Sequence, residues 1–235
     1  MEGFLLIDKP AGMTSHDVVN RVRRFTNERR VGHAGTLDPF ATGLLIVGVG
    51  RTATREMQKL VGLDKTYEAV FVLGLRSDTD DREGVILDAP LHPPQPDQSE
   101  IEAVLGTFVG EIEQIPPSYS AIKIGGKKMY EAAREGKPLE AKPRSVTIYS
   151  AELTKKATHE DAQTFITLTI SCSTGTYIRA IARDLGIALG GGGYVDVLRR
   201  TSIGPFSIDQ SHTLEALQSD VSTAIISVPE FLGSL

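Results

Sequence analysis

The chain has 235 residues, which is long enough for one large domain or two small ones. Of these residues 40% are hydrophobic, and the formal net charge is −5 at pH 7. No apolar run approaches the ~20 residues of a membrane-spanning helix, and the first residues lack the basic segment of a signal peptide. A single cysteine, Cys172, excludes an intramolecular disulfide, so we expect a soluble, cytoplasmic globular protein without membrane contact.

The first elements are a strand and a helix. Residues 3–8 are mostly apolar and predict a short strand, which ends at the turn sequence Lys9 to Gly12. Residues 14–15, Thr and Ser, then provide N-caps for a helix with Val18 and Val22 on one face. The arginines of this helix are expected on the opposite face.

A turning segment follows at Gly32 to Gly43. Three glycines and one proline in twelve residues predict a rigid loop that presents His33 and Asp38 at fixed positions. A loop aspartate can be a nucleophile, a general base or only a turn or helix cap, and local sequence leaves these alternatives open. The apolar residues 44–49 then predict a buried strand.

The middle of the chain alternates strand, connection and helix. Residues 66–73 alternate in a strand pattern, residues 89–98 contain four prolines and predict a surface connection, and residues 99–108 have helical apolar spacing. The second half predicts two paired strands at 145–153 and 164–172, a helix from Ile178 that ends at the glycines 190–193, and a short helix at 214–217. We expect one α+β domain with a large mixed or antiparallel sheet.

Several standard sites are excluded by spacing. The four-glycine run lacks the residues of a P-loop or a dinucleotide site, and the five histidines and one cysteine show no metal-ligand spacing. The segment Asp78 to Gly84 begins like a calcium loop, but Arg82 occupies a ligand position, so we interpret it as a turn with solvated carboxylates. The sequence therefore predicts neither a cofactor nor a metal.

Basic residues gather in two stretches of this acidic chain, although such runs are often only solvated faces. The first is Arg21, Arg23, Arg24, Arg29 and Arg30. The second is Lys123, Lys127, Lys128, Arg134, Lys137, Lys142 and Arg144. Two separate basic blocks indicate a phosphate-binding face.

Short segments then occur in a characteristic order along the chain. They are Lys9–Ser15, Gly32–Gly43, Lys65–Ala69, Gly74–Gly84, Gln114–Ala121, Gly175–Arg179 and Leu198–Thr201. In these segments the chain resembles the TruB family of tRNA pseudouridine synthases, from Gly3 to about Glu215. So many motifs in one order make the resemblance specific.

The resemblance implies a pseudouridine synthase fold, with a large mixed, mainly antiparallel central sheet flanked by helices and loops. It also implies isomerisation of uridine to pseudouridine at position 55 in the T-loop of tRNA, by base flipping and an aspartate nucleophile, without a cofactor. Whether Asp38 attacks the ribose, attacks the base or promotes a glycal route stays open. The alternative is a tRNA-binding or tRNA-folding module that uses the same groove with its chemistry secondary or lost.

The resemblance further assigns roles to single residues. It implies that Arg179 pairs with Asp38, that Tyr67 stacks on the target base and helps to move a proton, and that Tyr177 and Leu198 line the uracil pocket. It makes His33 the residue that takes the space of the extruded nucleotide. The residues expected to bind tRNA phosphates are Arg21, Arg23, Arg24, Arg30, Lys123, Lys127 and Lys128.

The resemblance also bears on organisation and partners. We expect a catalytic domain at 1–215 and a short tail at 216–235 that packs on it, with no C-terminal PUA domain. This arrangement is typical of a monomeric, standalone bacterial-type enzyme that recognises the T-arm stem-loop of tRNA without a guide RNA.

Overall fold

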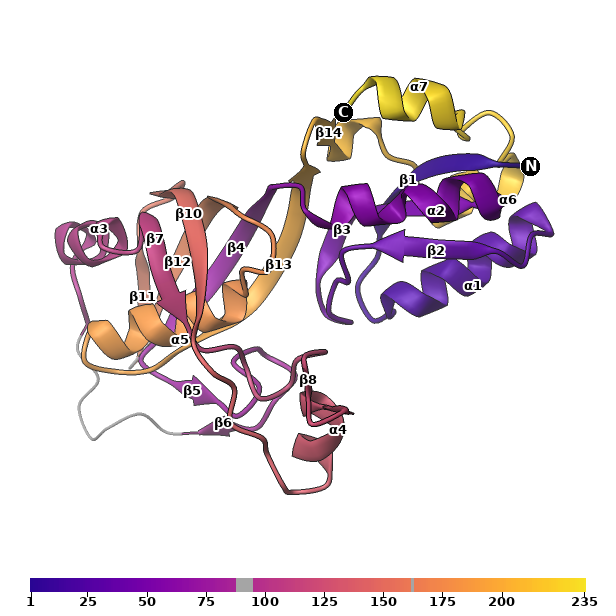
Figure 1. Ribbon diagram of the computed structural model, residues 1–235. Helices are drawn as coiled ribbons and strands as arrows, with labels where there is room; N and C mark the ends of the chain where they lie inside the picture. The colour runs from indigo at the N-terminus through magenta and orange to yellow at the C-terminus, as the bar shows by residue number, and fades with distance from the viewer. Residues whose placement is uncertain (88–94, 162) are drawn as a thin grey trace. The chain divides into compact units, whose positions relative to one another are not determined.

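The computed structural model describes residues 1–87, 95–161 and 163–235, and the chain divides into two compact units (Figure 1). Unit 1 comprises Met1–Glu68 and Leu198–Leu235, and unit 2 comprises Ala69–Val197. Strands β4 (Lys65–Leu73) and β13 (Gly193–Ile203) contribute residues to both units. Most of the expected surface connection at 89–98 lies outside the described residues.

Unit 1 is a sheet with helices on both faces. Its strands follow the order β1-β3-β13-β4, with β2 also paired to β3; β1 and β2 run antiparallel to β3, whereas β13 runs parallel to it. The other elements of unit 1 are β1 (Gly3–Lys9), α1 (Ser15–Thr26), β2 (Val31–Ala34), β3 (Thr42–Val49), α2 (Gly50–Val61), β14 (Phe206–Ser207), the 3-10 helix η1 (Ile208–Gln210), α6 (Leu214–Ser219) and α7 (Val228–Gly233).

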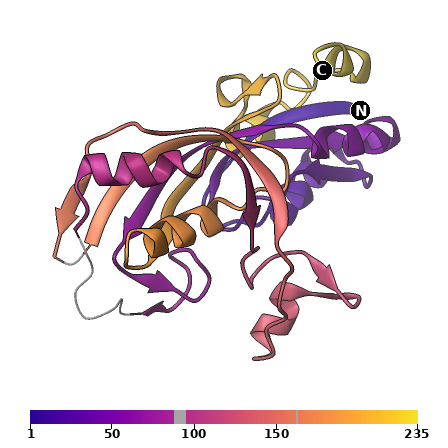
Figure 2. The same ribbon diagram turned by 60° about the vertical axis from the view of Figure 1, so that its left-hand side comes forward.

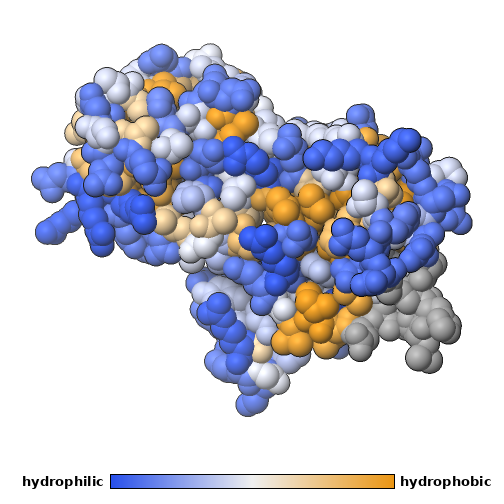
Figure 3. Space-filling view, turned by 180° about the vertical axis from the view of Figure 1, so that it is seen from behind, coloured by the Kyte–Doolittle hydropathy of each residue, from blue (hydrophilic) through white to orange (hydrophobic). Residues whose placement is uncertain are grey.

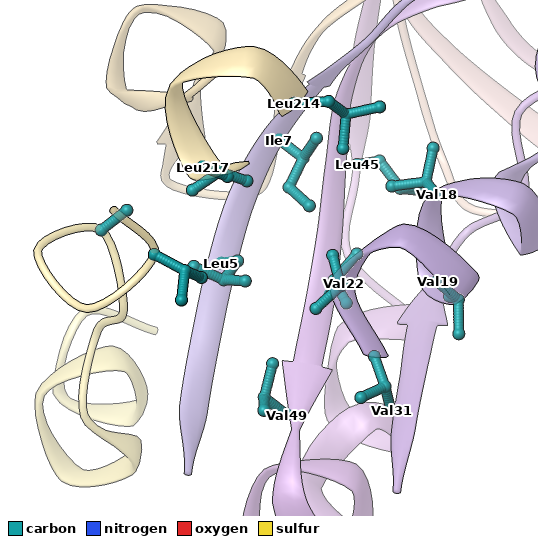
Figure 4. Packing of buried hydrophobic residues seen from close by; sticks show 13 residues of the cluster. Leu5, Ile7, Val18, Val19, Val22, Val31, Leu45, Val49, Leu214 and Leu217 are labelled. Carbon is teal, nitrogen blue, oxygen red and sulfur yellow. The ribbon is translucent and has the colours of Figure 1, made fainter. Parts of the chain in front are cut away.

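Alternate residues of β1 and β3 enter two separate apolar clusters. Leu5 and Ile7 of β1 pack with the valines of α1 and the leucines of α6 (Figure 4). Phe4 and Leu6 pack on the opposite face with residues of α2 and with Phe231 of α7. This period-two division explains why both strands are almost continuously apolar, because each face of the sheet is covered by helices.

The C-terminal segment completes the sheet of unit 1 at the edge of β1. The main chain of Phe4 exchanges two hydrogen bonds with Ile226, at 2.8 and 2.9 Å. The ring of Phe231 is fully buried and stacks on Phe4 at 3.9 Å and on Phe206 at 4.3 Å between ring centroids. The segment therefore covers an edge that would otherwise expose unpaired main-chain groups.

The strands of unit 2 follow the order β13-β4-β12-β10-β7 (Figure 2). Strand β10 is antiparallel to both β12 and β7. Helix α5 packs closely on the start of β13, because a Cβ on Gly193 would lie 2.1 Å from the carbonyl oxygen of Ala182. The remaining elements of unit 2 are β5 (Arg76–Ser77), β6 (Ile86–Leu87), α3 (Gln98–Gly106), β7 (Gly110–Gln114), β8 (Lys123–Ile124), β9 (Lys127–Lys128), α4 (Met129–Arg134), β10 (Arg144–Leu153), β11 (Thr158–Glu160), β12 (Gln163–Cys172) and α5 (Ile178–Ala188).

These elements confirm the α+β fold with a mixed, mainly antiparallel sheet. The strands expected at 3–8, 44–49 and 66–73 are β1, β3 and β4, and the paired strands expected in the second half are β10 and β12. The prediction of one loop from Gly32 to Gly43 is wrong at both ends: His33 lies in β2, opposite Val47, and residues 42–43 lie in β3. Both ends form strands because β3 is long enough to pair with β1, β2 and β13.

Hydrophilic side chains cover much of the face seen in Figure 3, interrupted by smaller apolar areas. None of the helices in the described part of the chain is long and apolar enough to cross a membrane.

Candidate active site

Asp38 lies in unit 1, in the segment between β2 and β3. Its carbonyl oxygen accepts a hydrogen bond from the N–H of Ala41 at 3.1 Å, which closes a tight turn. The side chain is half-buried, whereas its neighbour Leu37 is buried in the core. The residues 35–41, called the Asp38 loop below, therefore form an anchored turn with the carboxylate at its centre.

Ser15 holds the main chain on one side of Asp38. Its hydroxyl accepts a hydrogen bond from the N–H of Leu37 at 2.9 Å and donates one to the carbonyl of Leu37 at 3.1 Å. Ser15 is the first residue of α1, which begins there because Thr14 and Asp17 form a capping box. The buried hydroxyl thus satisfies both main-chain groups of the residue before Asp38.

Lys9 holds the main chain on the other side. This fully buried ammonium donates to the carbonyls of Met13 at 2.7 Å, Pro10 at 2.8 Å and Pro39 at 3.3 Å. The N–H of Gly12 also donates to the carbonyl of Pro39, at 2.9 Å. The turn after β1 and the residue after Asp38 are therefore joined through one buried cation.

Gly43 and Arg200 fix the base of the Asp38 loop. Gly43 has φ +102°, and a Cβ there would lie 2.2 Å from the carbonyl oxygen of Arg200, its partner in the parallel β3–β13 pair. The buried guanidinium of Arg200 donates from Nε to the carbonyl of Leu44 at 2.8 Å and from Nη2 to the carbonyl of Gly35 at 2.9 Å. One side chain thus contacts the first residue of the loop and the strand that follows the loop.

Leu198 and Tyr67 lie on the strands beside this loop. Leu198 is buried and comes one residue before Arg199, which pairs with Thr42 and forms a two-fold ion pair with Asp8 at 2.7 and 3.0 Å. Tyr67 is also buried, in β4, where the preceding residue accepts a hydrogen bond from the hydroxyl of Thr201 at 3.3 Å. Unit 1 therefore carries Asp38, Tyr67 and Leu198 on connected elements.

His33 lies in β2 with its imidazole half-buried. Burial lowers the pKa of His33 below its ordinary value, and the positive charges of Arg200 and His16 lower it further. The imidazole is therefore neutral at pH 7. Within the described residues, its Nδ1 atom is buried and has no hydrogen-bond partner.

The basic side chains of α1 differ in exposure. Arg21 and Arg24 are exposed and line a hollow of about 350 Å³ together with Asn20, Asp17 and the turn residues 12–13. Arg30 is also exposed. Arg23 is half-buried and donates to the carbonyl of Val31 at 3.2 Å and to Asn20 at 2.9 Å, so it has a structural role in unit 1.

Arg179 lies in unit 2, in the first turn of α5. It is buried, forms an ion pair of 3.2 Å with Asp81, and donates to the carbonyls of Thr79 at 2.8 Å and Tyr119 at 2.9 Å. Tyr177, directly before α5, is half-buried. Asp38 and Arg179 belong to different units, so their pairing stays a prediction.

The interpretation of Asp78 to Gly84 as a turn with solvated carboxylates is wrong for its two central aspartates. Asp80 and Asp81 are buried and pair with Arg183 and Arg179, at 3.0 and 3.2 Å. Burial raises the pKa of Asp80 to about 6, although Arg183 and Arg179 oppose this shift. The arginine partners lie about 100 residues away in the sequence, and no local pattern reveals them.

The second basic stretch surrounds the β8–β9 hairpin of unit 2. Lys127 forms an ion pair with Glu135, and Lys128 forms one of 3.7 Å with Glu131. Lys123 lines another hollow, of about 360 Å³, together with Lys142 and Arg144. Glu131 and Glu135 thus neutralise part of this stretch.

Sequence reasoning missed the side chains that hold the site. Ser15 and Arg200 pin the Asp38 loop, and Asp81 and Gln114 contact the beginning of α5. All four residues lie inside the segments in which the chain resembles the TruB family, and this position is the sequence feature that could have identified them. In residues 1–87, 95–161 and 163–235, no group of three or more His, Cys, Asp or Glu side chains could hold a metal ion.

The chain matches two known family models along most of its length. Residues 23–178 match the N-terminal domain of the TruB family pseudouridylate synthases, and residues 179–225 match the tRNA pseudouridylate synthase B C-terminal domain. The chain is 44% identical over 222 residues to tRNA pseudouridine synthase B of Arthrobacter sp. (strain FB24), covering 94% of this chain and 72% of the relative. It is 45% identical to the enzyme of the same name from Thermobifida fusca, covering 93% and 75%.

Solved structures show the same fold. An archaeal box H/ACA sRNP Nop10–Cbf5 complex contains a chain with TM-score 0.66 and 29% identity, and a Cbf5–Nop10–Gar1 complex contains one with TM-score 0.69 and 30% identity. The matches cover 92% of this chain but only 53% and 54% of those chains, so this chain spans about half their length.

Proposed function

The chain belongs to the TruB family of pseudouridylate synthases, and from this membership we propose that it converts uridine 55 in the T-loop of tRNA into pseudouridine with Asp38 as the nucleophile. The relatives that are tRNA pseudouridine synthases support tRNA as the substrate. We place this activity in the cytoplasm, in a monomer that acts without a guide RNA.

The observation that carries the proposal is the anchoring of Asp38. Ser15 holds Leu37, and Lys9 holds Pro39, so the main chain on each side of the carboxylate is fixed by a buried polar side chain. A carboxylate that only capped a turn would not need such support from β1 and α1. Preorganisation of this kind is what a nucleophile needs, because small displacements of a reacting group cost rate.

The proposed reaction needs no oxidant, reductant or second substrate. The bond between ribose C1′ and uracil N1 breaks, the uracil turns, and C1′ rejoins the base at C5. The hydrogen on C5 leaves as a proton and N1 gains one, so atoms and electrons balance. The carboxylate of Asp38 supplies the electron pair that the nucleophilic step requires.

Other side chains have supporting roles in this proposal. Arg179 pairs with Asp38 and keeps it ionised, because an adjacent cation favours the charged form of a carboxyl group. Tyr67 stacks on the flipped uracil and helps to move a proton, while Tyr177 and Leu198 line its pocket. His33, neutral and with a buried Nδ1, takes the space of the extruded nucleotide.

Basic residues of the two stretches bind the phosphates of the T-arm in this proposal. Arg21 and Arg24 are the strongest members, because they line the hollow beside the turn that contacts Pro39 of the Asp38 loop. Arg30 and the lysines Lys123, Lys127 and Lys128 extend the set. Arg23 is its weakest member, since its guanidinium already contacts Val31 and Asn20.

A tritium-release assay tests the proposal. tRNA transcripts labelled at C5 of uridine are incubated with wild type, Asp38→Asn and Asp209→Asn, the last being an exposed control in the same unit. We expect rapid release with wild type and the control, and at least a thousand-fold less with Asp38→Asn. A transcript with cytidine at position 55 should release no label from the T-loop.

Two outcomes would contradict the proposal. Tight tRNA binding by wild type without any release would favour the tRNA-binding or tRNA-folding module. Release by Asp38→Asn at more than a tenth of the wild-type rate would remove Asp38 from the nucleophilic role.

A further inference from the structure

Gln114 is a buried amide, only 1% exposed, at the end of β7. Its Oε1 accepts a hydrogen bond from the N–H of Tyr177 at 2.8 Å, and its Nε2 donates one to the carbonyl of Tyr177 at 3.1 Å. The two residues are 63 positions apart in the sequence. A single side chain thus holds both main-chain groups of one distant residue.

The chemistry of this contact requires an amide. A main-chain N–H needs an acceptor and a main-chain carbonyl needs a donor, and a glutamine side chain carries both at the right separation. A carboxylate offers only acceptors, and a methionine of similar length offers no strong hydrogen-bonding group. Because leaving a buried main-chain group unpaired costs free energy, neither of these side chains can replace the amide without loss.

The contact lies where α5 begins. Tyr177 is the N-cap residue of this helix, and its carbonyl also accepts the N–H groups of Ala180 at 3.1 Å and Ile181 at 3.3 Å. Gln114 therefore fixes the point from which the first turn of α5 starts. Arg179 lies in that turn, two residues after Tyr177.

The residues after Gln114 contact two arginines of α5. The carbonyl of Ile115 accepts a hydrogen bond from Arg183 at 2.9 Å, and the carbonyl of Tyr119 accepts one from Arg179 at 2.9 Å. The segment 114–119 thus contacts Tyr177, Arg179 and Arg183, and in the first of these contacts Gln114 contributes its side chain.

We propose that Gln114 is a positioning residue of the reaction, which acts by fixing the main chain of Tyr177 and, through the first turn of α5, the guanidinium of Arg179. The inference rests on the proposed function, since it assigns Gln114 to the placement of a pocket residue and of the partner of Asp38. It differs from a purely structural role because folding requires the helix to form, whereas the reaction requires its first side chains to be placed within a fraction of an ångström.

The test compares Gln114→Met with Gln98→Met, an exposed glutamine of α3 in the same unit. For Gln114→Met we expect kcat for tRNA isomerisation to fall about ten-fold or more, with the Kd for tRNA within two-fold of wild type. Amide hydrogen exchange at Tyr177 should accelerate about ten-fold, while the last turn of α5 keeps its protection. Gln98→Met should match wild type in every measurement.

The inference is overturned if folded Gln114→Met keeps kcat within two-fold of wild type, if exchange at Tyr177 is unchanged, or if activity falls only in proportion to the folded fraction.

Should this variant not fold, Gln114→Glu decides, because it keeps an acceptor for the N–H of Tyr177. A kcat lowered at least three-fold with unchanged tRNA Kd supports the inference, and an unchanged kcat refutes it. A wild type without isomerase activity would instead refute the proposed function, whereas the exchange measurement still reports on the contact itself.

Discussion

The hydroxyl of Ser15 and the main chain of Leu37 exchange two hydrogen bonds, although 22 residues separate them in the sequence. Ser15 begins α1, and Leu37 immediately precedes Asp38. The helix therefore does more than cover the sheet, because its first residue fixes the main chain that carries the carboxylate.

The first prediction concerns this pair. Ser15→Ala leaves the N–H and carbonyl of Leu37 without their partner, so we expect a loss of about 1–3 kcal/mol in the free energy of unfolding. Because the Asp38 loop also loses one anchor, kcat should fall about ten-fold while the Kd for tRNA stays unchanged. Urea denaturation and single-turnover kinetics measure the two effects. Ser222→Ala, at an exposed serine of the same unit, is the control, and equal kcat values for both variants would contradict the anchoring role.

The second prediction compares a glycine at which a side chain would clash with one at which only the positive φ disfavours a side chain. Gly43→Ala should cost about 3 kcal/mol or more, because its Cβ would lie 2.2 Å from the carbonyl oxygen of Arg200 in the β3–β13 pair. Gly12→Ala is the matched control: its φ is +75°, but a Cβ there meets nothing within 4 Å, so only about 1 kcal/mol is expected. Urea denaturation of both variants decides, and equal losses would show that the close approach at Gly43 relaxes freely.

The elements that the sequence predicted well are those with strong local patterns. Helix α1 and strands β10 and β12 show clear periodicity, β1 is a short apolar run, and α5 ends near the predicted glycines. Strand β2 was missed because its four residues contain Gly32 and His33, and it forms only by pairing with β3. Its stability comes from tertiary pairing, which local propensity does not report.

The candidate site could be predicted only in part. Asp38 stood out because glycines and a proline surround it, and the family resemblance pointed to Tyr67, Arg179 and Leu198. The residues that hold these groups were not predictable in the same way. Arg200, for example, is a fully buried cation whose partners are main-chain carbonyls, and no sequence pattern reports such a contact.

The third prediction tests the phosphate-binding surface of α1. The double variant Arg21→Glu and Arg24→Glu should weaken tRNA binding at least ten-fold at low salt, with kcat at saturating tRNA unchanged. The slope of log K against log salt should become shallower by about 1–2, because fewer counterions are released. The double variant Lys155→Glu and Lys156→Glu applies the same charge change at exposed sites outside the proposed set. If both double variants lower affinity equally, only net charge matters and α1 is not a specific contact.

The fourth prediction concerns the C-terminal segment of unit 1. Phe231→Ala removes a fully buried ring from between Phe4 and Phe206, and we expect a loss of about 3–5 kcal/mol in the free energy of unfolding. Leu235→Ala, at a side chain that is 47% exposed, should change it by less than about 0.5 kcal/mol. Thermal and urea denaturation provide the measurements. A small loss for Phe231→Ala would mean that the segment does not stabilise unit 1.

The last prediction follows from the buried carboxyl of Asp80 in unit 2. Burial raises its pKa from 3.8 to about 6 in the folded protein. Between about pH 4 and pH 6 the folded protein therefore retains a proton that the unfolded chain has released, so stability must fall as the pH rises through this window. A shift of this size corresponds to at most about 3 kcal/mol. Asp80→Asn removes the titration, and the difference in unfolding free energy between wild type and this variant should decrease by that order from pH 4 to pH 7.

Asp78→Asn, which removes an exposed carboxylate of the same loop, is expected to follow the wild-type curve. A difference between wild type and Asp80→Asn that is constant with pH would show that Arg183 and Arg179 stabilise the ionised form more strongly than burial destabilises it.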